Sequence, residues 1–360
     1  MNTKKLFIGL FIAALTFTSC SDDEGVDFQP VSPVTPETPS DAYENGILVI
    51  NQGGFGLGDG SVSYLSDDLS IAQNNIFNNV NDELLGDTAL SIAFKDNLAY
   101  VVLHGSEKIQ IVNRYTFESL GVIDEGLINP RYMAFANGKA YVTNWGDATD
   151  TSDDFVAVVD LNSNTITSTI PVVEGPERIV TVNGSLYITN KGGYGYGSSI
   201  TKIDSNNTVT TINTGDIPDE IFLDNNNNLW VLCEGSPDYS GNETDGSLIK
   251  INTNDDTISK TIDFGRNTFE SSIIYDNGLI YFYNGGEIYK MNEDDTNLPA
   301  NPIITQNLDY GGIAIKNNMF YGTEPDYNNG TSKIHVYDLD SNSLQNTFEL
   351  GNGGFNIYFN

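Results

Sequence analysis

Few side chains in this sequence of 360 residues combine the types and the spacing that catalysis or metal binding requires. The chain has only two histidines, and neither stands at a His–Cys or His–x–His spacing that suits a metal ion. His335 lies in the alternating stretch 333–337, which predicts a strand, whereas His104 ends a predicted strand and opens a short loop. These two residues alone define no active site.

Carboxylates are far more frequent, but their spacing matches no known metal loop or catalytic set. Asp153–Asp154 and Asp255–Asp256 lack the pattern of a calcium loop, and no Ser/His/Asp set can be chosen by spacing. The 49 acidic and 16 basic side chains give a net charge of -33, which argues against nucleic acid as a partner. Because 39% of the residues are hydrophobic, the chain can still bury a sizeable core.

The first residues have the features of an export signal. Residues 1–19 contain two lysines, a short apolar run and small residues just before Cys20, so they resemble a bacterial lipoprotein signal peptide with acylation of Cys20. The alternative is an ordinary secretory signal in which Cys20 is incidental. Residues 20–42 are acidic at first and then rich in proline, which predicts an extended tether. Acylation would leave Cys233 as a buried thiol without a partner.

The acidic run Asp22–Glu24 resembles the surface-export signal of Bacteroidota lipoproteins, although it is also compatible with a simple solvated charge run. A chain this acidic is repelled by anionic lipid, so attachment to the outer membrane would depend on the acyl chains. We therefore expect an outer-membrane lipoprotein that faces the cell exterior.

A repeat fills residues 43–360. One unit is seen in residues 131–144, where two apolar strands flank the turn Asn137-Gly138, and it continues with strands at 155–160 and 165–170. Successive units are 40 to 52 residues apart. Their aligned apolar residues, called anchors below, are Ile92, Met133, Ile179, Ile221, Ile273, Ile313 and Ile357.

Four short strands in each unit of about 40–45 residues predict the blade of a β-propeller. Six full units occupy about 88–350. Three strand-like runs remain in 46–77 and one in 354–359, so we expect a seventh blade closed by the C-terminal strand. No helical periodicity follows the signal. The fold class is therefore an all-β, seven-bladed β-propeller; the alternatives are a stack of hairpins or an open solenoid.

Loop lengths assign a binding face to this propeller. The turns between strands 1 and 2 are tight Asn-Gly pairs, whereas the loops between strands 2 and 3 are long, and these lie on the opposite rim. That rim carries aromatic side chains on glycine-rich loops, and the connections between blades add cations. The candidate ligand-binding residues are Phe55, His104, Arg131, Trp145, Arg178, Tyr194, Tyr196, Tyr239, Arg266, Phe269, Tyr310 and Tyr327.

Each candidate also has a plain structural interpretation. A loop tyrosine can pack under its own loop. Arg131 and Arg178, taken as equivalent positions of successive blades, can grip an anionic ligand or form repeated ion pairs with Glu177 or Glu220. The pairing interpretation is slightly favoured.

The repeat also resembles known families. Tyr141-Val-Thr-Asn144 and Tyr187-Ile-Thr-Asn190 are similar to the repeat of YVTN-type β-propellers. A narrower resemblance is to surface cobalamin-binding lipoproteins of Bacteroidota. It rests on residues 49–56 and 61–64 of the first blade, together with 129–131, 175–177, 229–233 and 288–291. The resemblance implies capture of cobalamin, as a transported ligand and not a cofactor, and transfer to a TonB-dependent outer-membrane transporter. In that setting His104 could be an axial ligand of cobalt, the alternative being a hydrogen bond within its loop.

Three other functions remain open. The same face could capture haem or a siderophore for a different transporter, or an acidic rim could serve protein interaction or adhesion. A lactonase-type hydrolase would instead need carboxylates that converge on the central channel, where Glu177, Glu220 and Glu270 are the candidates. We expect a binding protein and not an enzyme.

Overall fold

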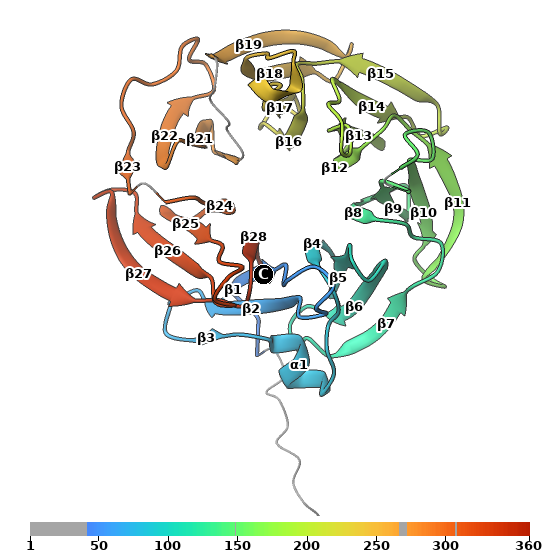
Figure 1. Cartoon of the computed structure of the whole chain (residues 1–360), viewed down its shortest axis with the longest axis vertical. Coiled ribbons are helices and arrows are strands. Elements are labelled where there is room, and N and C mark those ends of the chain that lie inside the picture. Colours follow the sequence, from blue (N-terminus) through green and yellow to red (C-terminus); the bar gives the residue numbers. More distant parts are fainter. Residues whose placement is uncertain (1–41, 148, 266–271, 307) are drawn as a thin grey trace, which may run out of the picture. The chain divides into compact units, whose positions relative to one another are not determined.

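The strands form seven four-stranded antiparallel sheets that are arranged as blades around a common axis (Figure 1). The computed structural model describes residues 42–147, 149–265, 272–306 and 308–360, so the predicted signal peptide, Cys20 and nearly all of the tether lie outside the described residues. Within this part of the chain the prediction of an all-β, seven-bladed propeller is confirmed.

Six blades are continuous in sequence, and each runs from its inner to its outer strand. The second and third blades consist of β4 (Ala89–Lys95), β5 (Leu98–Leu103), β6 (Lys108–Asn113) and β7 (Ser119–Ile123), and of β8 (Pro130–Ala136), β9 (Lys139–Asn144), β10 (Phe155–Asp160) and β11 (Thr165–Pro171). The fourth and fifth consist of β12 (Pro176–Val182), β13 (Ser185–Asn190), β14 (Ser199–Ile203) and β15 (Val209–Asn213), and of β16 (Pro218–Leu223), β17 (Leu229–Cys233), β18 (Gly246–Asn252) and β19 (Thr257–Gly265). The sixth and seventh consist of β20 (Ile273–Asp276), β21 (Leu279–Asn284), β22 (Glu287–Asn292) and β23 (Ile304–Thr305), and of β24 (Gly312–Lys316), β25 (Met319–Glu324), β26 (Lys333–Asp338) and β27 (Ser343–Glu349).

The first blade combines both ends of the propeller domain. Its outer strands are β1 (Gly46–Asn51), β2 (Ser61–Ser66) and β3 (Ala72–Gln73), and its inner strand is the C-terminal β28 (Gly354–Phe359). β28 pairs with β1 in antiparallel register, with Ile357 opposite Val49. The predicted closure by the C-terminal strand is therefore confirmed. Because β28 completes the first blade, β1 has no unpaired edge on its inner side.

The anchors lie on the seven inner strands, one on each. Six of them are buried, and they pack between neighbouring blades. Met133, for example, belongs to a cluster that joins β4, β5 and β6 to β8, β9 and β10 through Tyr100, Val102 and Val142. The core of the propeller is thus a series of apolar layers between blades, which explains why one apolar position recurs in every unit.

The tight turns have the conformation that their sequence predicts. Asn137 and Gly138 have φ values of 51° and 75°, and both residues of the pairs 183–184 and 277–278 also have positive φ. Two consecutive residues with positive φ are typical of a two-residue hairpin turn whose twist matches that of the strands.

One element differs from the sequence prediction. Residues 76–81 form the short helix α1 (Ile76–Asn81), and the third strand of the first blade is only the two residues of β3. Ile76 and Phe77 are buried in one cluster with Tyr43 and Phe117. These apolar residues, which resemble a strand in the sequence, therefore belong to a short helix that packs against the first blade. The single-turn 3-10 helix η1 (Asp238–Ser240) lies in the loop after β17. Among the described residues, no helix is long and apolar enough to cross a membrane.

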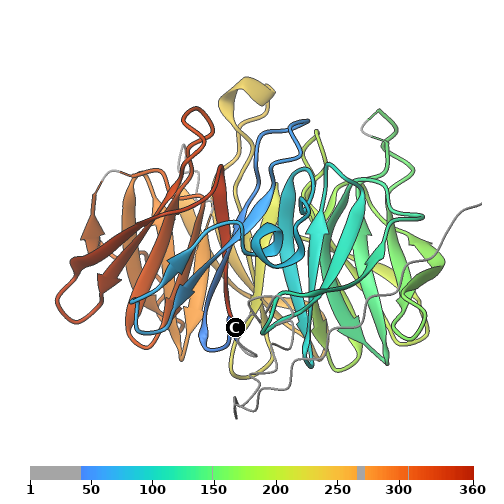
Figure 2. The same cartoon turned by 90° about the horizontal axis from the view of Figure 1, so that it is seen from below.

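The long loops between second and third strands project from one side of the ring (Figure 2). They cover residues 52–60, 145–154, 191–198, 234–245 and 325–332, which are the loops that the sequence assigned to a single rim. This side is called the long-loop face below.

Candidate ligand-binding site

Three rings of residues surround the axis near the long-loop face. The residues of each ring stand at the same sequence distance from the anchor, or from the partner of the anchor on the second strand. The first, the upper ring, lies two residues before each anchor, and its described members are Leu90, Arg131, Glu177, Asp219, Gly311 and Phe355. A register shift recurs just before the anchor in three blades, between Pro130 and Met133, Pro176 and Ile179, and Pro218 and Ile221. All six upper-ring residues line a cavity of about 230 Å³, together with Gln52, Tyr132, Arg178, Lys191, Glu234 and Tyr310.

The second ring, the lower ring, lies one residue before each anchor. Its members are Ser91, Tyr132, Arg178, Glu220, Ser272, Gly312 and Asn356. Five of them line a second cavity of about 100 Å³, whose apolar walls come from inner strands. Arg178 lines both cavities and therefore lies between them.

This counting corrects one sequence inference. Arg131 is not the equivalent of Arg178, because it lies two residues before its anchor whereas Arg178 lies one residue before. Arg131 is instead equivalent to Glu177, and Arg178 to Tyr132. The error arose because both arginines open an inner strand, while the anchors set the true register.

A third ring comes from the residues just after the second strands. Val142 pairs with the anchor Met133, and Trp145 follows three residues later. The same count gives Gln52, His104, Lys191 and Glu234 in four other blades, and Gly285 and Pro325 in the remaining two. Gln52, Lys191 and Glu234 line the larger cavity, so a position that looks like the first residue of a loop contributes to its wall in three blades.

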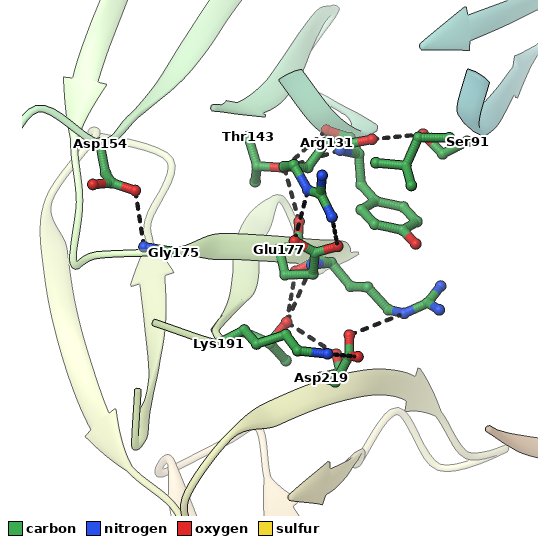
Figure 3. Close-up of polar contacts among 12 residues, drawn as sticks. Ser91, Arg131, Thr143, Asp154, Gly175, Glu177, Lys191 and Asp219 are labelled. Carbon is green, nitrogen blue, oxygen red and sulfur yellow. Dashed lines mark hydrogen bonds and ion pairs between the residues drawn. The ribbon is translucent and has the colours of Figure 1, made fainter. Parts of the chain in front are cut away.

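One ion pair of the upper ring joins two blades through two hydrogen bonds. Arg131 donates from Nε and Nη2 to the two carboxylate oxygens of Glu177, at 2.8 and 2.9 Å (Figure 3). The backbone is fixed as well, because Ser91 Oγ donates to the Arg131 carbonyl and Thr143 Oγ1 donates to the Glu177 carbonyl, both at 2.8 Å. The pairing interpretation of Arg131 with Glu177 is confirmed.

A second network continues around the axis. Arg178 Nη2 donates to Glu220 Oε1, and Arg178 Nε lies 3.6 Å from Asp219 Oδ1. Lys191 Nζ donates to Asp219 and, at 3.0 Å, to Glu234 Oε1. The pairing of Arg178 with Glu220 is therefore also confirmed.

The cluster holds more carboxyl groups than cations. Arg131, Arg178 and Lys191 face the four carboxyl groups of Glu177, Asp219, Glu220 and Glu234. Burial raises the pKa of Glu220 to about 8 and that of Glu234 to about 7, so the network takes up protons near neutral pH. Burial also acts on Asp219, but Lys191 and Arg178 outweigh it and hold the pKa of Asp219 below its ordinary value.

His104 and Trp145 flank Arg131. Burial and the positive charge of Arg131 lower the pKa of His104 to about 4, so its imidazole is neutral at pH 7. His104 Nδ1 is buried and has no hydrogen-bond partner among the described residues. The Trp145 ring lies 4.1 Å from the Arg131 guanidinium carbon and makes an edge contact with Tyr194.

The predicted aromatic residues divide into exposed and buried groups. Phe55, Tyr194 and Tyr239 are 81%, 75% and 83% exposed, and Tyr196 and Tyr327 are about half exposed. Tyr310, by contrast, is buried in edge-to-face contact with Tyr283 and Phe320, although it also lines the larger cavity. Arg266, Phe269 and Glu270 lie outside the described residues.

Sequence reasoning missed several members of the site. Lys191, Asp219 and Glu234 belong to the ion-pair cluster, and Tyr132 and Asn356 lie beside Arg178 in the lower ring. Their positions in the sequence could have identified them, because each stands a fixed number of residues from an anchor or from the partner of the anchor on the second strand. No group of three or more His, Cys, Asp or Glu side chains within the described ranges could hold a metal ion.

The arrangement defines a propeller with a polar axial site beneath an aromatic face. The chain belongs to the family described as a domain of unknown function, DUF5074, whose profile matches residues 45–350. No curated protein matches it significantly.

Several solved structures share the fold at low sequence identity. A periplasmic gluconolactonase of Pseudomonas aeruginosa is 10% identical over 87% of this chain and 98% of its own, with a TM-score of 0.63. Dihydro-heme d1 dehydrogenase NirN in complex with DHE is 12% identical over 91% and 77%, with a TM-score of 0.57. A streptogramin B lyase is 18% identical over 71% and 81%, with a TM-score of 0.52. Such identities establish the propeller fold alone.

Proposed function

We propose that this protein captures cobalamin, or a related corrinoid, on the long-loop face and passes it to a TonB-dependent outer-membrane transporter. One observation carries the proposal: five exposed or half-exposed aromatic side chains stand on the loops that surround an axial site whose cations are already paired. The resemblance of the first blade to cobalamin-binding lipoproteins also supports cobalamin as the ligand.

Exposed aromatic rings on a rigid scaffold suit a broad, flat ligand. Phe55, Tyr194 and Tyr239 lie on three different loops of one face, so together they can contact a macrocycle several rings wide. The blades that carry these loops are fully paired sheets, and little would have to be ordered when the ligand binds. One protein with this fold, the dehydrogenase above, acts on a haem d1 derivative, which is compatible with a macrocyclic ligand.

The charge balance favours a corrinoid over haem or a catechol siderophore. Both of those ligands carry acidic groups that require free cations. Arg131 and Arg178 already pair with Glu177 and Glu220, so neither cation is free for an acidic ligand. A corrinoid is fringed with uncharged amides, which this polar site can bind through hydrogen bonds without adding negative charge.

The features of the N-terminal residues support a location at the outer membrane. We propose that acylation of Cys20 anchors the chain to the outer membrane and that residues 20–42 tether the propeller at the cell exterior. In that position the long-loop face can meet both the ligand and the transporter.

A second candidate is a hydrolase or lyase that acts at the axis. Glu220 and Glu234 lie at cavities, beside Arg178 and Lys191, with pKa values raised into the range of general acids and bases. A gluconolactonase and a lyase share the fold. Turnover of lactones that is lost in Glu220→Gln would establish this function.

The experiment that tests the primary proposal is a titration of residues 43–360 with cyanocobalamin, haem and a catechol siderophore, followed by calorimetry and visible spectroscopy. We expect tight one-to-one binding of cyanocobalamin alone. Preferential binding of haem or the siderophore would replace the corrinoid by that ligand. Binding of none of the three would refute small-molecule capture of this kind and favour a role in protein interaction or adhesion.

A further inference from the structure

The guanidinium group of Arg178 has unused hydrogen-bond donors. An arginine side chain offers five N–H donors, yet within the described part of the chain its recorded side-chain hydrogen bond runs from Nη2 to Glu220. Among the described residues Arg178 Nε is buried without a hydrogen-bond partner, and Asp219 Oδ1 is 3.6 Å from it. Because a buried donor without an acceptor is costly, this edge of Arg178 is suited to an acceptor that is not part of the protein.

Acceptor atoms lie beside these donors in the same cavity. Glu220 accepts from Arg178 through Oε1, which leaves Oε2 for a second partner. Asn356 donates from Nδ2 to the Leu90 carbonyl at 2.9 Å and to Tyr132 Oη at 3.2 Å, which leaves Oδ1 as an acceptor. Arg178, Glu220 and Asn356 all line the cavity of about 100 Å³.

The other walls of the cavity are small or apolar. Ser272 and Gly312 occupy the lower ring opposite the arginine, and the remaining contacts come from Ile273, Ile313 and neighbouring inner-strand residues. Gly312 leaves no room for a side chain, since a Cβ atom there would lie 2.7 Å from the Phe355 carbonyl oxygen. The cavity is therefore small, rigid and polar on one side.

We propose that this axial cavity binds a primary carboxamide group. The carbonyl oxygen of the amide accepts from the free edge of Arg178, and its NH₂ group donates to Glu220 Oε2 and Asn356 Oδ1. A primary amide carries its acceptor beside its donors, so one amide group can accept from Arg178 and donate to the carboxyl and amide oxygens of Glu220 and Asn356, which line the same cavity.

Charge distinguishes the amide from a carboxylate of the same shape. A carboxylate would lose far more solvation free energy than an amide on entering this small cavity among Ile273, Ile313 and Ile357, and the cation that lines the cavity, Arg178, is already paired with Glu220. An amide fills the same space without changing the charge. The isosteric pair acetamide and acetate therefore tests the proposal directly.

The chain is well suited to this measurement because it contains only four arginines, Arg114, Arg131, Arg178 and Arg266. Each gives one Nε–H signal in a ¹H–¹⁵N spectrum, and Arg178→Lys assigns the signal of Arg178. We expect millimolar acetamide to shift the Arg178 signal in a saturable way, and acetate at the same concentration to shift it much less. Arg114, whose Nε donates to Asn360 at 2.7 Å, provides the internal control, and its signal should not move.

Three results would overturn the proposal. A response to acetate that equals or exceeds the response to acetamide would make the cavity a carboxylate site, and the absence of a saturable shift with either probe would remove the site. Arg178→Lys keeps a positive charge near Glu220 but lacks the planar edge, so any acetamide response that persists at other cavity residues in this variant also contradicts the proposed contact.

The carboxamide site does not depend on capture of a corrinoid. If acetamide binds and cyanocobalamin does not, the site stands and the proposed function fails. If both bind, we expect Arg178→Lys to weaken cyanocobalamin binding roughly tenfold, as the loss of hydrogen bonds to a charged donor does. Unchanged cobalamin affinity in that variant would show that no amide of the corrinoid enters the cavity.

Discussion

Arg131 on β8 and Glu177 on β12 form a two-point hydrogen-bonded ion pair across the boundary between two blades, and the indole of Trp145 covers the guanidinium. The side chains of Arg131 and Glu177 are 14% and 6% exposed. Loss of one partner would therefore leave a nearly buried charge. We expect Glu177→Gln to lower the free energy of unfolding by about 3 kcal/mol, measured by urea denaturation.

The exposed pair of Lys95 and Asp96 gives the matched control, because its atoms are 3.7 Å apart at the surface. Asp96→Asn should change the free energy of unfolding by less than about 0.5 kcal/mol. The double substitution Arg131→Leu with Glu177→Leu should recover most of the stability lost in Glu177→Gln. Equal losses in Glu177→Gln and Asp96→Asn would show that the interblade pair contributes no more than a surface contact.

Stability should fall as the pH rises from 6.5 to 8. Glu220 and Glu234 have folded-state pKa values of about 8 and 7, against an ordinary value of 4.5, so the folded state holds protons that the unfolded state has lost. The stability that these protons contribute is complete below pH 4.5 and disappears as the pH passes through 7 and 8. Thermal unfolding at several pH values measures the effect.

The double variant Glu220→Gln with Glu234→Gln supplies the control for this pH dependence. Glutamine cannot ionise, so the fall in melting temperature between pH 6.5 and 8 should largely disappear. A wild-type melting temperature that stays level or rises across this range would contradict the raised pKa values of the axial cluster.

Gly175 fixes the loop that carries Tyr194 and Tyr196. Its φ is +68°, and a Cβ atom there would lie 1.9 Å from the Gly193 nitrogen, so the loop would have to move. Gly138 has a similar φ of +75° in open space. We expect Gly138→Ala to cost about 1 kcal/mol and Gly175→Ala at least twice as much, with loss of ligand affinity in Gly175→Ala alone. Similar losses of stability in both variants would mean that the loop adapts to the added methyl group.

The exposed aromatic residues should matter for binding and not for folding. Tyr194→Ala and Tyr239→Ala remove rings that are mostly in solvent, so the melting temperature should stay unchanged. If the rings contact the corrinoid, calorimetry should show affinities reduced roughly fivefold in each variant, about 1 kcal/mol. Leu344→Ala on the outer strand β27 removes a half-exposed apolar side chain away from the long-loop face and should leave the affinity unchanged. Loss of affinity in the Leu344 variant would indicate a general effect of surface substitution.

The repeat explains why the fold could be predicted in such detail. An apolar anchor between blades is required in every unit, and positive φ is required at each tight turn, so both leave a periodic trace in the sequence. Ile357 shows how far this extends, because its spacing from Ile313 identified the strand that closes the ring. Ile76 and Phe77 are the exception: they sit outside the repeat, where burial alone does not distinguish a strand from a turn of helix.

The site could be predicted only in part. Loop residues can be recognised from composition and loop length, whereas residues on the inner strands are placed by their register relative to the anchors. The exposed tyrosines were found from composition and loop length. Asp219 and Glu234 were missed because nothing about an isolated acidic residue shows that it faces a lysine from another blade. Counting from the anchors would have placed both in the axial rings. The raised pKa of Glu220 depends on how deeply it is buried, which no sequence pattern reveals.

His104 provides the last prediction, which concerns cobalt. Its pKa of about 4 leaves the imidazole neutral, with a nitrogen lone pair available, at every pH above about 5. If His104 replaces the exchangeable water of aquocobalamin, the visible spectrum should shift on binding, and the shift should persist at pH 5.5, where a histidine with the ordinary pKa of 6.5 would be mostly protonated. His104→Ala should bind the corrinoid without this shift. A shift that remains in His104→Ala, or that disappears below pH 6.5 in the wild type, would exclude His104 as the axial ligand and leave it as a neutral imidazole in the field of Arg131.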